Sequence, residues 1–79
     1  MGGSIPKAIA EFKKARQMAP NDLVNLLSLG QAYQDAKENA KALEVLNQAL
    51  LVKTPADPGE AADNRKDIEK VIQEIKSEN

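Results

Sequence analysis

Few side chains in this sequence could act as nucleophiles, and none has a histidine to activate it; the lysines and carboxylates are explained as solvated surface groups. The hydroxyl groups belong to Ser4, Ser28, Ser77, Thr54 and Tyr33. The chain has no histidine and no cysteine, so it lacks the usual general base, a thiolate nucleophile and the commonest metal ligands. It also has no glycine-rich phosphate loop. The residues therefore predict a protein that is not an enzyme and that holds no metal and no cofactor.

The charges are nearly balanced, which argues against binding to nucleic acid or to a membrane. Eleven basic and twelve acidic residues give a formal net charge of −1, too little to attract a polyanion over a distance. A group of basic side chains without interleaved aromatics is explained as a solvated helix face (Lys7, Lys13, Lys14 and Arg16). No apolar run approaches the ~18 residues that a membrane span needs. We therefore expect no nucleic acid, no direct membrane contact and, by default, a cytoplasmic location.

Composition and periodicity predict an all-α fold. Phe12 and Tyr33 are the only aromatic residues, so the core must be aliphatic and rich in alanine, which suits closely packed helices better than a sheet. Apolar residues recur at helical spacing over four segments, at about 5–18, 22–37, 40–52 and 58–77.

Proline, glycine and capping residues separate these segments. Asn21 or Asp22 should cap the second helix, Asn39 the third and Asp57 the fourth. Residues 5–79 are expected to form one domain. Met1–Ser4 is interpreted as a vector-derived or disordered start that lies outside it.

The second and third segments carry a pattern of large and small residues that predicts a helix–helix seam. Small residues are needed where two backbones approach closely, and large ones where the space opens. Seven positions alternate in this way: Leu26, Leu29, Gly30, Tyr33, Ala42, Leu46 and Ala49.

Part of this pattern recurs 34 residues earlier. Sliding the sequence by 34 places Ala8 on Ala42, Phe12 on Leu46 and Ala15 on Ala49. The first helix therefore looks like the second half of a repeat whose first half is missing.

These residues together resemble the tetratricopeptide repeat (TPR), a 34-residue helix–turn–helix unit. Leu26 stands where that family often has tryptophan. The resemblance implies an all-α, four-helix, right-handed antiparallel stack made of half a repeat, one full repeat and a C-terminal capping helix. The segment 58–77 fits the capping role because it has one narrow apolar face and otherwise carries charge.

The resemblance also implies a function in protein–protein interaction. In TPR arrays the first helix of each repeat lines a concave surface that holds an extended peptide or a partner's helix, so the chain would be a scaffold or adaptor segment. The corresponding positions here are Val24, Leu27, Ser28, Gln31, Gln34 and Asp35. They lack the basic pattern of the TPRs that clamp a C-terminal carboxylate, so a neutral, partly apolar ligand is expected. The alternative is that Val24 and Leu27 pack beneath the capping helix.

A second hypothesis concerns the incomplete first repeat. Ile5, Ile9 and Phe12 should face the missing helix as well as the second one, and an exposed apolar patch favours self-association into a homodimer. The chain would then be a homo-oligomerisation element. A third alternative is a non-catalytic TPR domain from a larger enzyme or membrane protein.

Overall fold

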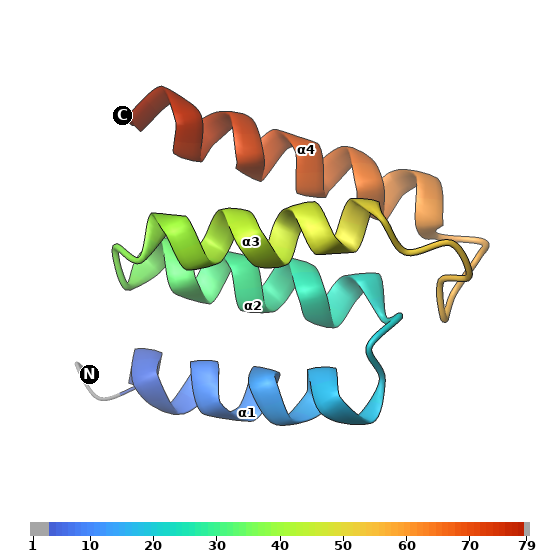
Figure 1. Cartoon of the computed structure of the whole chain (residues 1–79), viewed down its shortest axis with the longest axis horizontal. Coiled ribbons are helices and arrows are strands. Elements are labelled where there is room, and N and C mark those ends of the chain that lie inside the picture. Colours follow the sequence, from blue (N-terminus) through green and yellow to red (C-terminus); the bar gives the residue numbers. More distant parts are fainter. Residues whose placement is uncertain (1–3, 79) are drawn as a thin grey trace.

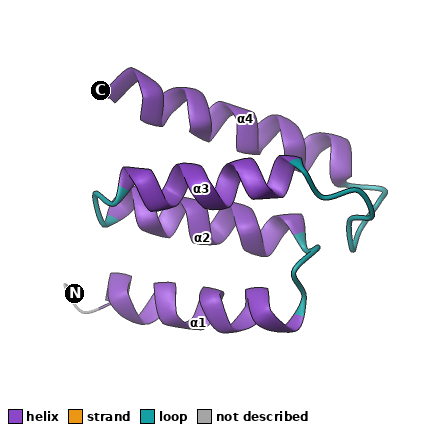
Figure 2. Cartoon of the chain, viewed as in Figure 1, coloured by secondary structure: helices purple, strands orange, loops and turns teal. Residues whose placement is uncertain are grey.

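The structure of the chain, a computed structural model, describes residues 4–78. It contains four helices: α1 (Ser4–Met18), α2 (Leu23–Asp35), α3 (Asn39–Leu50) and α4 (Ala61–Glu78). Each runs antiparallel to the one before it (Figure 1). The described residues contain no strand, and loops are confined to the connections (Figure 2). The predicted all-α class with four helices is therefore confirmed.

Helix α2 is the centre of the packing. It contacts α1, α3 and α4, whereas α1 contacts only α2 among the described helices. This explains why apolar residues cover more than one side of α2, with Leu23, Leu26, Leu29 and Ala32 all buried. The core therefore lies around α2, α3 and α4, and α1 is attached to one side of it.

The predicted seam between α2 and α3 is present and closely packed. Leu26, Leu46, Ala42 and Ala49 have no solvent exposure. A Cβ atom added to Gly30 would stand 2.5 Å from Cδ2 of Leu46, closer than side chains tolerate. Gly30 is therefore required because Leu46 packs directly against the backbone of α2.

Helix α4 presents the expected apolar stripe to this core. Its buried residues are Ala61, Ile68, Val71, Ile72 and Ile75. Helix α4 contacts both α2 and α3, and its other side chains are mostly exposed. Its C-terminal end is held by Glu78, whose carboxylate accepts hydrogen bonds from Gln34 (3.4 Å) and Asn39 (3.3 Å).

The N-terminal caps of α2 and α3 were predicted with mixed success. Asp22 caps α2 as predicted, accepting from the N–H groups of Val24 (3.0 Å) and Asn25 (3.3 Å). The prediction for Asn39 was wrong, because Asn39 is already the first residue of α3 and Glu38 precedes it without a side-chain cap bond. Ser4, which was expected to precede the domain, is the first residue of α1. The other residues of that expected start, 1–3, lie outside the described residues.

The helix-to-helix connections also differ in detail from the sequence-based ranges. Helix α2 ends early, at Asp35, because Lys37 adopts a left-handed conformation (φ 64°) that turns the chain back. Helix α4 starts at Ala61 rather than near Pro58, because the Glu60 N–H bonds to the Asp57 carbonyl in a turn. Asp57 is thus a turn residue and not the cap of α4.

The long α3–α4 loop is tied to the α1–α2 corner. The Asn21 side-chain amide donates to the Thr54 carbonyl (2.8 Å), and the Ala56 N–H donates to the Asn21 carbonyl (3.0 Å). From the other side, the Arg65 guanidinium donates to the Val52 carbonyl (3.0 Å). The α3–α4 loop contains prolines and a glycine and forms no helix or strand. These three bonds give some of its backbone groups the hydrogen-bond partners that regular structure would otherwise supply.

Candidate protein-binding surface

The six predicted concave-face residues divide into two groups on α2. Val24, Ser28, Gln31 and Asp35 follow one another at spacings of four, three and four, so they share one face of the helix. Val24 is 51% exposed, and Gln31 and Asp35 are also exposed. Val24 is therefore not covered by α4, which leaves this face open for contact.

The other two predicted residues, Leu27 and Gln34, do not belong to this set. Leu27 is half-buried and packs against the core. Gln34 uses its side-chain amide to bond Glu78 of α4. The alternative interpretation, packing beneath the capping helix, is wrong for Val24, which is 51% exposed; for Leu27 it stays a prediction.

The exposed face of α2 continues into a groove of about 320 Å³ between α1 and α2. Helix α1 contributes Ile5, Ala8 and Phe12, and α2 contributes Ser28, Gln31, Ala32 and Asp35. The groove, called here the α1–α2 groove, has an apolar floor, with its polar groups along the α2 side. Such a surface can bury apolar side chains of a ligand and orient them with a few hydrogen bonds.

The lining of this groove includes residues from two separate sequence-based hypotheses. Ser28, Gln31 and Asp35 come from the predicted partner-binding face, while Ile5 and Phe12 come from the predicted self-association patch. Ile9 does not line the groove and packs against the core instead. Ala8 and Ala32 were not among the predicted site residues. The 34-residue offset could have identified Ala8, because it pairs Ala8 with Ala42 of the predicted seam.

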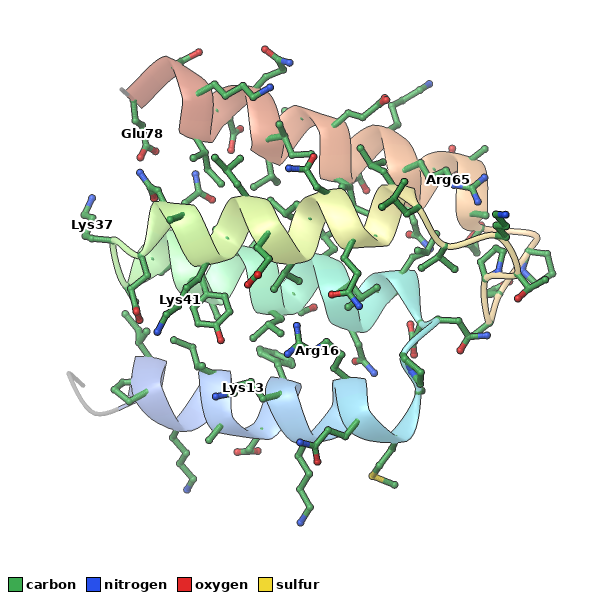
Figure 3. All side chains as sticks on the ribbon, in the orientation of Figure 1. Lys13, Arg16, Lys37, Lys41, Arg65 and Glu78 are labelled. Atoms are coloured by element: carbon green, nitrogen blue, oxygen red, sulfur yellow. The ribbon has the colours of Figure 1, made fainter. Side chains whose placement is uncertain are left out.

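Two further features lie outside this groove. Arg16 of α1 extends toward the neighbouring helices (Figure 3) and lines a polar hollow with Glu44 and Gln48 of α3. Near the α2–α3 turn, Lys41 forms an ion pair with Glu38 (3.0 Å) and stands 5.9 Å from the centre of the Tyr33 ring. The hydrogen bond from Lys41 to Glu38, together with the negative charge of Glu38, raises the pKa of Lys41.

The described residues contain no group of three histidine, cysteine, aspartate or glutamate side chains that could hold a metal ion. None of the helices that the structure describes has the length and apolar character of a membrane span. Of the candidate nucleophiles, Ser28 lies half-buried in the α1–α2 groove and Tyr33 is buried in the core.

Comparison with known proteins gives one family match. Residues 2–76 match the family model described as "Regulator of microtubule dynamics protein 1-3". No significant match was found among curated proteins or among solved structures. The family match spans nearly all of the chain, from before α1 to near the end of α4.

Proposed function

Because the chain belongs to the regulator of microtubule dynamics protein 1-3 family, we propose that it is a protein–protein interaction module of the microtubule system. The observation that carries the proposal is the open face of α2, where Val24, Gln31 and Asp35 are exposed although α2 is the most buried helix of the fold. A face of this kind, formed by a helix that neighbours hold on its other sides, binds without large ordering costs. The cytoplasm, where microtubules assemble, is the location that fits this role.

We further propose that the four helices form a TPR-like stack with α2 on its concave side. Three features support this: the 34-residue offset between α1 and α3, the close contact of Gly30 with Leu46, and the packing of α4 against both α2 and α3. In such a stack the exposed face of α2 would be the binding surface, and α4 would close the C-terminal end.

The experiment is co-sedimentation of the purified chain with polymerised tubulin. Val24→Lys places a charge on the exposed face of α2 and should reduce the pelleted fraction severalfold. Leu51→Lys is the matched control, because Leu51 is also an exposed aliphatic residue (77%) but lies at the end of α3. Circular dichroism should show both variants folded. Failure of the wild-type chain to pellet, or equal losses in the two variants, would contradict the proposal.

Self-association is a second candidate, favoured by the exposed Ile5 and the half-buried Phe12 in the α1–α2 groove. In that case the chain would form a homodimer through α1. Light scattering over a range of concentrations tests this, since a dimer through the groove should revert to monomer in Phe12→Glu.

A further inference from the structure

The face of α1 that carries Ala8, Phe12 and Ala15 has one neighbour fewer than its counterpart on α3. The 34-residue offset pairs these residues with Ala42, Leu46 and Ala49. The α3 residues have no solvent exposure, whereas the α1 residues are only half-buried. The reason is that α3 packs against both α2 and α4, while α1 packs only against α2 among the described helices.

We propose that the α1–α2 groove is a docking site for an amphipathic helix of a partner protein, which packs on α1 as α2 packs on α3. The proposal rests on the protein-binding role proposed above and specifies what kind of protein segment the site takes. The groove is continuous with the internal helix packing of the fold, because Phe12 both lines the groove and packs against the core.

The packing of α2 on α3 defines the residues that such a helix needs. Leu46 lies against Gly30, and the ammonium group of Lys41 lies over the ring of Tyr33. By the same offset, Phe12 requires a glycine or alanine opposite it, and Lys7 would lie over an aromatic ring three residues further along the partner helix. A large residue four positions before the small one, as Leu26 precedes Gly30, completes the pattern.

Charge complementarity specifies the flanks of the partner helix. Asp35 lines the groove, and Glu11, one turn along α1 from Ala8, stands where α3 has the buried Val45. Both carboxylates are exposed, and among residues 5–78 neither forms an ion pair. Lysine or arginine opposite these two carboxylates would therefore pair with them, whereas an acidic residue of the docked helix is accepted only beside Lys7 and Lys14, which lie one turn on either side of Glu11.

The polar groups of the groove favour a helix over an extended peptide. An extended chain must find hydrogen-bond partners for the N–H and C=O groups along both of its edges. The α1 side offers only Ile5, Ala8 and Phe12, whose side chains have no polar atom. A helix satisfies its own backbone and needs only an apolar surface. A second copy of the chain fits less well, because its own α2 already packs against its α3.

The probe is a labelled peptide with the sequence of residues 21–37 carrying Asp35→Lys, which holds the Leu26–Gly30–Tyr33 pattern and a net positive charge. Binding to the purified chain is measured by fluorescence anisotropy. We expect saturable binding that weakens at least tenfold when the peptide also carries Gly30→Leu, because the added side chain would collide with Phe12. Equal affinity of the two peptides, or no binding, would overturn the proposal.

Charge variants of the chain locate the site. Glu11→Lys should weaken peptide binding at least fivefold, while Glu44→Lys, an equal charge change at another exposed position, should not. Equal losses in both variants would show a non-specific charge effect and overturn the assignment. A dimer that the peptide does not dissociate would identify a second copy as the occupant and also overturn it.

Helix docking in the groove and tubulin binding can be tested separately, because Val24 does not line the groove. Peptide binding with no tubulin pelleting would keep the helix site and reject the microtubule partner. Tubulin pelleting that depends on Val24, without peptide binding, would keep the function and reject the helix site.

Discussion

Replacing Gly30 by alanine should destabilise the fold, although the same change stabilises most helices. At an ordinary helical position, Gly→Ala gains about 1 kcal/mol of helix propensity. Here the new Cβ would stand 2.5 Å from Cδ2 and 2.6 Å from Cγ of Leu46. Leu46 is fully buried beside Ala42 and Ala49, so it cannot rotate away without displacing other core groups.

The magnitude follows from these two opposing effects. Overpacking of a tight core costs about 1–3 kcal/mol, so after subtracting the propensity gain of about 1 kcal/mol we expect a net loss of up to about 2 kcal/mol. For a domain of this size a loss of about 2 kcal/mol corresponds to a fall in Tm of roughly 8–16 °C. Gly30→Leu should cost more, since it adds further atoms to the same contact. Thermal and urea unfolding followed by circular dichroism measure both.

A double-mutant cycle with Leu46→Ala tests the cause. Leu46→Ala alone should cost about 2–5 kcal/mol, but it removes the atoms that a Cβ at residue 30 would meet. In that background Gly30→Ala should therefore become neutral or stabilising, giving a coupling energy of about 1–3 kcal/mol. If Gly30→Ala instead stabilises the wild-type chain by about 1 kcal/mol, the reasoning about the seam is refuted.

Three further predictions concern the caps, the loop and the ion pair. Asp22→Ala removes both side-chain bonds to the start of α2 and should lower the free energy of unfolding by about 1 kcal/mol in urea titrations; an unchanged midpoint would contradict the cap. Asn21→Ala removes one of the two bonds that tie the α3–α4 loop to the α1–α2 corner and keeps the backbone bond from Ala56, so hydrogen exchange in that loop should accelerate while the helices keep their protection. Glu38→Gln should return the pKa of Lys41 toward its ordinary value of 10.5, as measured by NMR titration. Because the pKa of Lys41 is raised in the folded state, the Lys41–Glu38 ion pair contributes to the free energy of unfolding at neutral pH. This contribution disappears as the pH rises through the pKa of Lys41, so the wild type and Glu38→Gln should converge in stability in strong base.

The sequence predicted the seam and the helices well because their signals are local. Leu26, Gly30 and Leu46 combine size, spacing and propensity in a way that leaves few other arrangements, and the structure packs them as expected. The capping of α2 by Asp22 was equally accessible, since a short acceptor before an apolar run is a strong signal.

The turn geometries were less predictable because they depend on distant contacts. The side chain of Asn39 bonds Glu78 of α4 instead of capping α3. Asp57 lies in a loop whose conformation depends on Asn21 and Arg65 from other parts of the chain.

The α1–α2 groove was not predicted as one surface. Gln31 and Asp35 belonged to the hypothesis of a partner-binding face, and Ile5 and Phe12 to the hypothesis of self-association. The packing of α1 on α2, which the sequence does not specify, brings these residues to the same groove. Leu27 is half-buried against the core, a distinction from the exposed Val24 that helical spacing alone does not make.

The central position of α2 has a consequence for how the chain folds and opens. The α2–α3 hairpin has a short connection and a complete seam, so it can form first, and α1 and α4 can then dock on it. Since α1 contacts α2 alone, its detachment leaves the rest of the core intact. We therefore expect unfolding to begin at α1 as a separate step, with its amides exchanging well before those of α3.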